Sequence, residues 1–416
     1  MLIGVFFIYS SGVSSTGIVF SNEYIKQIIW SCTGIALIVI IFFINWTRFE
    51  DFSLYIYLFF IVLLIATLFF GKVVNGSRSW LGPAGVGIQP SEFAKIGFIL
   101  YLAYFLKSYK SQNFGLIQFS VGIGITLFPM LLIFLQPDMG TAIVYFPIFL
   151  IMCFVAGVKR RYIFFLIISL ILLIIFTVLP IWNEYVQIGG GKAARMFQNK
   201  VFIRYSFLAL ILILATSILG LIFIKKRYFY WILYGASILL FSFGAAIAIR
   251  MVLKEYQLMR LIVFLNPDID PQGAGWNIIQ SKIAVGSGGL LGKGFLKGTQ
   301  SHYRFLPQQS TDFIFSIISE EWGFFGGLLI FILFAVLLIR GFIIILNSKD
   351  LYAVYVGTGV LTMIFFHVIV NIGMAMGIMP ITGIPLFFLS YGGSSLWTVS
   401  LGIGLLLSIQ RQKSIY

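Results

Sequence analysis

The chain has 416 residues, of which 60% are hydrophobic and 10% are charged, and its mean hydropathy is +1.04. This composition excludes an ordinary soluble domain and indicates a membrane protein. The formal net charge of +15 raises nucleic acid as a partner, but no basic, aromatic stripe lies on a soluble element. We therefore expect no nucleic-acid binding, and we attribute the charge to membrane sidedness and to contact with anionic membrane lipid.

Apolar runs of about 18 to 25 residues recur along the chain, and each is long enough to cross a bilayer as a helix. They predict an all-α polytopic membrane protein with about 12 transmembrane segments in a single integral membrane domain, residues 1–416. The first run is too short to cross the bilayer unaided. The predicted segments are 2–12, 27–45, 51–70, 91–106, 115–135, 139–157, 162–180, 203–224, 229–249, 313–339, 351–373 and 389–409.

Lysine and arginine are concentrated in alternate connections, as the positive-inside rule expects for cytoplasmic loops. With both termini in the cytoplasm, the segments 71–90, 181–202 and 250–312 lie on the outer side. The two longer outer segments are also basic. This suggests an anionic ligand there, although a solvated loop surface explains the cations equally well. Their basic residues include Lys192, Arg195, Arg250, Lys254 and Arg260.

The stretch 266–275, NPDIDPQGAG, is acidic and rich in turn residues within an otherwise apolar chain. Its prolines push the residues before them, Asn266 and Asp270, toward extended geometry, and its glycines allow tight turns. The stretch therefore predicts a stiff loop that presents Asp268 and Asp270 beside the membrane. A carboxylate there can act as a general base, bind a metal ion or cap a helix. The polar, glycine-rich segment 275–294 that follows predicts an interfacial helix and then a loop.

Acidic residues number only 13, so those at membrane depth are candidates for function or for ion pairing. Glu92 and Lys95 lie three apart on one helical face and are predicted to form an ion pair. Such a pair is tolerated at bilayer depth only against other helices or a wet cavity. Asp138, at the outer end of a predicted helix, is expected to be an N-cap.

Three further acids lie around the start of one later span. Asp312 is placed as the N-cap of that helix, and Glu320 and Glu321 lie about two turns into it. With the acids at the other outer helix ends, they suggest a polar cavity that opens outward. His302 and His367 are too few and too far apart in the chain for a zinc site.

From the residues alone, two classes of function suit an outward polar cavity with an aspartate beside the bilayer. One is an enzyme that acts on a lipid-linked anionic substrate, and the other is a transporter or flippase. A transporter built from repeats should show matching broken helices in its two halves. Only a weak echo relates 87–94 to 134–142, so the residues favour the enzyme.

Four stretches make the sequence similar to the SEDS family (shape, elongation, division and sporulation), and within it to the RodA branch. They are NGSRSWLGPAGVGIQPSEFAKIG (75–97), QPDMGTA (136–142), the long run 266–326, and NIGMAMGIMPITGIPLFFLSYGGSS (371–395). The stretches occur in the family's order. The resemblance implies a fold with a core of about 10 transmembrane helices. The apolar pair 203–249 is then an extra transmembrane hairpin, which preserves sidedness, and 250–312 is the large extracytoplasmic loop.

The resemblance also implies an activity. Members of the family are peptidoglycan glycosyltransferases that polymerise lipid II, an undecaprenyl-pyrophosphate disaccharide-pentapeptide, on the outer face of the bacterial cytoplasmic membrane. It further implies a class B penicillin-binding protein as the transpeptidase partner, help from a divalent cation such as Mg²⁺ or Mn²⁺, and no organic cofactor. A lipid II flippase and a non-catalytic scaffold of the elongation machinery remain alternatives.

The family's essential aspartate, directly before the second proline of the loop, matches Asp270, which we expect to be the general base of an inverting glycosyl transfer. Two positions depart from the family's pattern: Ser79 stands where many members have arginine, and Gln308 stands where many have glutamate. The sequence does not identify which residues would bind a metal ion. Residues expected to bind substrate are Trp80, Arg260, Gln280, Ser281 and Lys282, and those expected to support or line the cavity are Glu92, Lys95, Asp138, Asp312, Glu320 and Glu321.

Overall fold

A computed structural model describes residues 1–416 except 75, 83–86, 110–113, 186–198, 253–254, 274 and 414–416. Lys192, Arg195 and Lys254, part of the predicted basic outer surface, lie outside the described residues. The regular secondary structure of the described residues is helical apart from one small antiparallel sheet of two strands. This confirms the predicted all-α fold.

The described residues form two compact units, Met1–Val158 with Asn277–Tyr416, and Lys159–Trp276. The first unit contains α1 (Leu2–Ser11), α2 (Glu23–Phe43), α3 (Trp46–Asp51), α4 (Ser53–Phe70), β1 (Lys72–Val74), β2 (Ser77–Trp80), α5 (Pro90–Ser108), α6 (Leu116–Leu135), α7 (Met139–Ile143), α8 (Tyr145–Val155), α14 (Trp276–Ser287, without its first residue), α15 (Thr299–His302), α16 (Ile314–Leu346), α17 (Leu351–Ala375) and α18 (Gly393–Lys413). The second contains α9 (Arg160–Tyr185), α11 (Lys200–Phe223), α12 (Arg227–Val252), α13 (Glu255–Leu265) and the 3₁₀ turn η2 (Pro267–Ile269).

Within the described residues, 9 helices are long and apolar enough to cross a bilayer, so the chain is a multi-pass membrane protein. The predicted span 139–157 is divided into α7 and α8, which meet at Val144. The predicted span 389–409 begins later, at Gly393, because an irregular segment precedes α18. Helix α1 has 10 residues, which agrees with its expected shortness.

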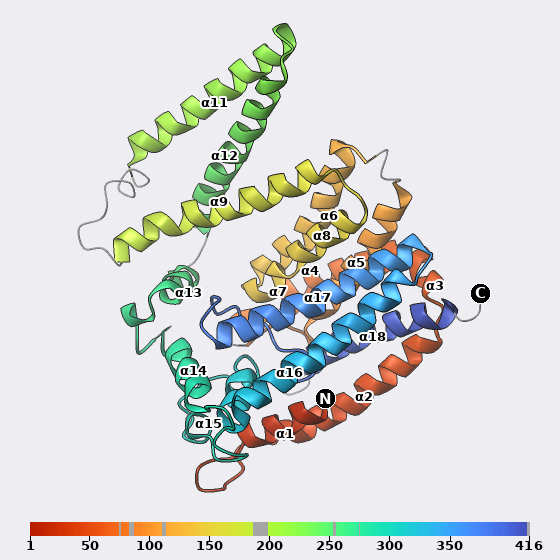
Figure 1. Ribbon diagram of the computed structural model, residues 1–416, viewed down its shortest axis with the longest axis vertical. Coiled ribbons are helices and arrows are strands. Elements are labelled where there is room, and N and C mark those ends of the chain that lie inside the picture. The colour runs from red at the N-terminus through yellow and green to blue at the C-terminus, as the bar shows by residue number, and fades with distance from the viewer. Residues whose placement is uncertain are drawn as a thin grey trace. The chain divides into compact units, whose positions relative to one another are not determined.

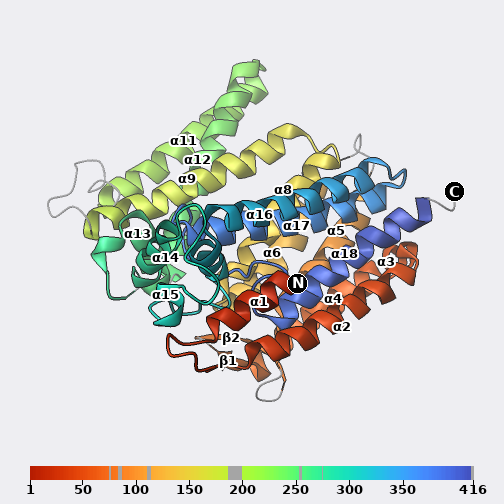
Figure 2. The same cartoon turned by 60° about the horizontal axis from the view of Figure 1, so that its bottom comes forward.

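In the first unit, α2 lies beside α18, α4 beside α5, and α16 beside α17 (Figures 1 and 2). Helices α17 and α18 form the centre, since most of their apolar windows are buried. Small residues bring helices together at several points. A Cβ atom on Gly404 would lie 2.7 Å from Ile41 Cβ, and one on Gly359 would lie 2.6 Å from Ile99 Cγ2. Close approach over small residues is a general way of packing helices in membranes.

In the second unit, α12 contacts both α9 and α11 (Figure 1). Helices α11 and α12 correspond to the predicted hairpin 203–249 and are joined by a short turn in which Lys225 has a φ of 55°. Phe243 on α12 packs against Phe207 on α11, with ring centroids 5.2 Å apart. Helix α13 and η2 then lead into the acidic loop.

Candidate functional site

The acidic loop after α13 forms a turn, in which Asn266 has the extended backbone that the following proline predicts and Asp270 does not. Asn266 is extended, with φ −145° and ψ 97°, and its side chain accepts a hydrogen bond from Asp268 N at 3.2 Å. Asp270 has φ −138° and ψ 71° and is half-buried, whereas Asp268 is exposed. The Asp270 carbonyl accepts from the backbone N–H groups of Gly273 at 3.3 Å and Gly275 at 2.9 Å. The turn therefore fixes the backbone that carries Asp270.

The glycines of this turn are required by close approach. A Cβ atom on Gly275 would collide with the Pro267 carbonyl and lie 2.6 Å from the Asp270 carbonyl oxygen. A Cβ atom on Gly273 would meet the Asp270 carboxylate, which therefore folds over that glycine. Arg260, on α13 of the same unit, is exposed.

Trp80 ends the small hairpin in segment 71–90, where β1 and β2 pair antiparallel. The indole is half-buried, and a Cβ atom on Gly87 would lie 2.9 Å from its Cε3. Arg78 fastens the hairpin to the bundle, because its backbone N–H donates to the Gln136 carbonyl at 3.2 Å and its Nη1 donates to the Leu68 carbonyl at 3.3 Å. The role of Trp80 at substrate stays a prediction.

The predicted ion pair at the start of α5 is confirmed. Lys95 Nζ lies 2.9 Å from Glu92 Oε1, and both side chains are buried. Lys95 also contacts His367 on α17, with 3.1 Å between Nζ and Nε2. The second carboxylate oxygen of Glu92 is buried without a hydrogen-bond partner within the described residues. The pair therefore depends on α17 as well as on its own helix.

Asp138 is the predicted N-cap: its Oδ1 accepts from Thr141 N at 3.2 Å at the start of α7. Its other oxygen accepts from Gln89 Nε2 at 2.7 Å and from Ser91 Oγ at 3.4 Å. Asp138 therefore ties α7 to the start of α5. The same prediction was wrong for Asp312, because Phe313 occupies the N-cap position of α16 and no side chain caps that helix.

The three neighbours Gln280, Ser281 and Lys282 lie on α14, a helix as predicted. Gln280 is buried, and Ser281 is fully buried, with its hydroxyl 2.6 Å from both Ser316 Oγ and the Ala375 carbonyl. As placed, Ser281 joins α14 to α16 and α17. Lys282 is exposed and lies along Gly377, where a Cβ atom would come within 2.9 Å of its Cε.

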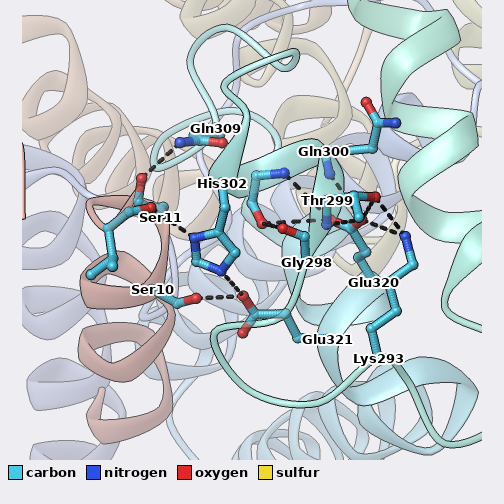
Figure 3. A network of polar contacts seen from close by, with 12 residues as sticks. Ser10, Ser11, Lys293, Gly298, Thr299, Gln300, His302, Gln309, Glu320 and Glu321 are labelled. Carbon is cyan, nitrogen blue, oxygen red and sulfur yellow. Dashed lines mark hydrogen bonds and ion pairs between the residues drawn. The ribbon is translucent and has the colours of Figure 1, made fainter. Parts of the chain in front are cut away.

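Glu320 and Glu321 are fully buried and hold the loop between α14 and α16 onto the bundle (Figure 3). Oε1 of Glu320 accepts from Lys293 Nζ at 2.8 Å, from Thr299 N at 2.7 Å and from Gln300 N at 3.0 Å. A fully buried carboxylate with charged and backbone donors around it is a structural anchor.

Glu321 joins three separate parts of the chain (Figure 3). Ser10 Oγ of α1 donates to Glu321 Oε1, and His302 Nε2 of α15 lies 3.3 Å from the same oxygen. His302 Nδ1 lies 2.7 Å from the Val13 carbonyl. Since both ring nitrogens face acceptors, the contacts favour the imidazolium form of His302. The carboxylates of this network thus act as ties among α1, α15 and α16.

Helix α16 is broken at Gly323, two residues after Glu321. Gly323 has φ 64° and ψ −157°, which interrupts the helical hydrogen bonds. The loop after α14 satisfies the freed groups: Lys293 N donates to the Glu320 carbonyl at 3.0 Å, and Phe324 N donates to the Gly289 carbonyl at 2.8 Å. Only glycine tolerates this backbone conformation without strain.

The His302 contact predicts pH-dependent stability. The pKa of His302 is raised above its ordinary value of 6.5, chiefly by its polar contact with Glu321. A raised folded-state pKa means that the tie is at full strength below about pH 6.5 and is lost as pH rises through the folded-state pKa. The charged groups facing the ring are Glu321 and, beyond it, Glu320 with Lys293. We therefore expect the protein to lose stability when His302 is deprotonated.

The measurement is thermal unfolding in detergent micelles between about pH 5 and 8, for the native sequence and for His302→Gln. The native protein should lose stability toward the higher pH, and His302→Gln should remove that slope. A matched control is Gln309→Leu, which breaks the neighbouring contact from Gln309 Nε2 to the Ser11 carbonyl, 2.7 Å long, and removes no titratable group. Equal pH slopes in the native protein and in His302→Gln would contradict the assignment.

From the sequence, both histidines were considered only as zinc ligands, and no other role was predicted for them. Within the described residues, no group of three or more His, Cys, Asp or Glu side chains is arranged to hold a metal ion. The histidines act instead through the carboxylate and the ammonium beside them. One feature of the sequence could have indicated a shared role for His367: Asn371 lies four residues further on, so the two polar side chains are on the same face of an apolar helix.

The fold is a multi-pass helical bundle with an ion pair in its core and an acidic loop that contains two prolines. It is the fold of an integral membrane protein, as expected for a chain that carries the SEDS motifs. The chain matches the FtsW/RodA/SpoVE family of cell cycle proteins over residues 1–206 and 201–415, and it belongs to that family.

Two curated relatives show how far the similarity extends. The chain is 50% identical to the peptidoglycan glycosyltransferase RodA of Treponema pallidum, over 99% of this chain and 95% of the relative. It is 34% identical to stage V sporulation protein E of Bacillus subtilis, over 99% of this chain and 94% of the relative. Both alignments run nearly end to end.

Solved structures give the same fold. One comes from a study of the structural coordination of polymerization and crosslinking by a peptidoglycan synthase complex. It has a TM-score of 0.65 at 26% identity and covers 99% of this chain and 95% of that chain. The rod shape determining protein RodA of Thermus thermophilus has a TM-score of 0.59 at 22% identity, with coverages of 99% and 93%.

Proposed function

We propose that this chain is a peptidoglycan glycosyltransferase that polymerises lipid II during cell elongation and maintenance of cell shape. The observation that carries the proposal is the 50% identity with a peptidoglycan glycosyltransferase along nearly the whole of both chains. The stiff loop that presents Asp270 supplies a group suited to the chemistry.

The proposed reaction is an inverting transfer without a covalent enzyme intermediate. The 4-hydroxyl of the acceptor lipid II gives its proton to the Asp270 carboxylate. The hydroxyl oxygen forms a bond to the anomeric carbon of the growing strand, and the bond from that carbon to pyrophosphate breaks. Undecaprenyl pyrophosphate leaves with the electron pair. General-base assistance of this kind contributes about 10²–10⁴-fold to a rate.

The departing pyrophosphate calls for positive charge. Arg260, exposed on α13, is the proposed cation from the protein, because guanidinium groups stabilise charge that develops on phosphates. The described residues offer no cluster of three metal-binding side chains. A carboxylate such as Asp268, which is exposed in the acidic loop, would hold a divalent cation, since Mg²⁺ is commonly bound by one or two carboxylates together with substrate phosphates. Such a cation would supply charge neutralisation.

The proposed setting is the bacterial cytoplasmic membrane, with the loop 250–312 on its outer face. A class B penicillin-binding protein is the proposed partner, which would crosslink the strands that this chain makes. The relative solved within a peptidoglycan synthase complex supports this partnership. The surplus of cations in the alternate connections supports the orientation.

The test is polymerisation by the purified chain together with its partner, using fluorescent lipid II and Mg²⁺ or Mn²⁺. We expect a ladder of glycan strands on a gel and a lower yield after chelation with EDTA. Unchanged lipid II in the presence of either cation, from protein that is folded and bound to its partner, would contradict the proposed activity.

The geometry of the acidic loop leads to a prediction about its glycines. Gly275→Ala forces the backbone at Pro267 and Asp270 to move, so polymerisation should fall about 10²-fold, as expected when a reacting group is misplaced by an ångström. The atoms nearest to the added carbon in Gly273→Ala belong to the Asp270 carboxylate, the proposed base, so its rate should fall by a similar factor, while its stability should fall less because that side chain can rotate. Gly286→Ala is the control, since no neighbour lies within 4 Å of the added carbon.

Polymerisation rates and thermal stabilities of these three variants check the prediction. Full activity of Gly275→Ala would show that the turn need not hold Asp270 in place.

A further inference from the structure

An irregular segment, 376–392, separates the membrane-spanning helices α17 and α18. At bilayer depth, backbone outside a helix is tolerated only where protein or a wet cavity satisfies its polar groups. Two side chains one turn apart on α17 do this. His367 Nδ1 lies 3.0 Å from the Pro385 carbonyl, and Asn371 Nδ2 donates to the Ile384 carbonyl at 2.8 Å.

The protonation state of His367 follows from its partners. Its Nε2 lies 3.1 Å from Lys95 Nζ, and an ammonium group has only donors, so Nε2 must accept. The proton of the neutral ring is therefore on Nδ1, which donates to the Pro385 carbonyl. Lys95 thus donates to both Glu92 and His367, and His367 donates onward to the irregular segment.

The contribution of His367 to the Glu92–Lys95 pair is large because all three side chains are buried. Glu92, Lys95 and His367 are 2%, 0% and 0% exposed. A buried ion pair offsets its desolvation cost only when further hydrogen bonds satisfy its charges, and the imidazole supplies one. The ring itself is held by Phe387, which stacks on it with centroids 3.8 Å apart.

The segment that His367 holds also anchors the end of the long outer loop. Ser390 Oγ donates to the Thr311 carbonyl at 2.5 Å, and Tyr391 N donates to the Ser310 carbonyl at 2.8 Å. A continuous set of contacts therefore runs from the ion pair on α5, through α17 and the irregular segment, to the residues that precede α16.

We propose that His367 is a positioning residue: a permanently neutral Nδ1–H imidazole that directs the Lys95 ammonium toward Glu92 and fastens the irregular segment. Through that segment it positions Ser310 and Thr311, near the end of the loop that precedes α16. The effect on catalysis rests on the proposed glycosyltransferase function, whereas the hydrogen-bonding pattern of His367 is independent of that function.

The first test uses the fact that the chain has only 2 histidines. Labelling the imidazole nitrogens with ¹⁵N gives two sets of signals, and His302→Gln removes one of them. The His367 set should show one protonated nitrogen, Nδ1, and one unprotonated nitrogen, Nε2, at every pH between about 5 and 8. Lys95→Met should move the Nε2 signal while Nδ1 stays protonated. An imidazolium, or a proton on Nε2, would overturn the proposal.

The second test compares two replacements of His367 in the complex with the transpeptidase partner. In His367→Gln the amide can accept from Lys95 and donate to the Pro385 carbonyl, so polymerisation should stay within about threefold of the native rate. His367→Leu can do neither. It leaves the buried Pro385 carbonyl without its contact and leaves Lys95 with Glu92 alone, so the rate should fall about tenfold or more. Equal rates for the two variants would overturn the positioning role.

His367→Leu could fail to fold, so His367→Leu with Lys95→Met and Glu92→Gln is the companion variant. It removes the buried charges and should restore stability in detergent, while the rate stays low because Pro385 is still unfastened. A native rate from this variant would overturn the proposal. Failure of the proposed function has a different signature: the native protein would make no polymer, and the ¹⁵N pattern of His367 would be unchanged.

Discussion

Replacing Asp270 with asparagine is expected to abolish glycan polymerisation. Asparagine nearly keeps the size of the side chain and can keep the backbone of the turn, in which the Asp270 carbonyl accepts from Gly273 and Gly275. It loses the base, so the rate of strand formation should fall by about 10²–10⁴-fold. Expression, thermal stability and binding to the partner should be unchanged. The rate is measured with purified complex and labelled lipid II, beside the unfolding temperature.

Asp268 provides the matched control, since it lies in the same loop, carries the same charge and is exposed. Asp268→Asn should cause a smaller loss, and that loss should shrink further when the divalent cation is raised, if Asp268 helps to hold the cation. Equal loss in the two variants at every cation concentration would show that the wrong aspartate was assigned as base. Normal strands from Asp270→Asn would remove its catalytic role altogether.

The largest stability effect is expected from Lys95→Met. The variant leaves the Glu92 carboxylate buried without its counter-charge, and one oxygen of that carboxylate already has no hydrogen-bond partner within the described residues. Removing one member of a buried pair typically costs about 3–5 kcal/mol. Thermal or denaturant unfolding in detergent should show this loss, and yield in the membrane should fall with it.

Two comparisons make this prediction specific. Adding Glu92→Gln to Lys95→Met removes the buried charge and should recover most of the stability. Lys107→Met, by contrast, breaks two partly exposed pairs, with Glu50 at 2.8 Å and with Asp350 at 3.2 Å, and should cost no more than about 1 kcal/mol for each pair. Equal losses for Lys95→Met and Lys107→Met would contradict the view that burial decides the effect.

The sequence was a good guide wherever one local rule governs. The membrane-spanning helices were predictable because bilayer thickness demands long apolar runs. The pair Glu92 and Lys95 was predictable because residues three apart share a helical face. Asp138 was predictable as an N-cap from its place before a helix. The same rule failed for Asp312, which lies one residue before the N-cap position of α16. There the helix starts after Phe313, and Asp312 lies outside the cap position.

Contacts between distant segments were not predictable in this way. His367 meets Lys95 from 272 residues along the chain, and Glu321 meets Ser10 from 311 residues away. Nothing local to either residue records its partner. The break at Gly323 was also missed, since an apolar run with glycines reads as one helix, whereas the broken turn exists only because residues 289–294 cover it.

The most direct measurement of the proposed polymerase activity uses sealed vesicles that contain this chain with its partner, with labelled lipid II in one leaflet only. We expect glycan strands to form when lipid II is in the leaflet on the side of the loop 250–312. Neither the native chain nor Asp270→Asn should move lipid II across the bilayer, and Asp270→Asn should make no strands. Movement of lipid II between leaflets without any strand formation would contradict the account and identify the chain as a transporter.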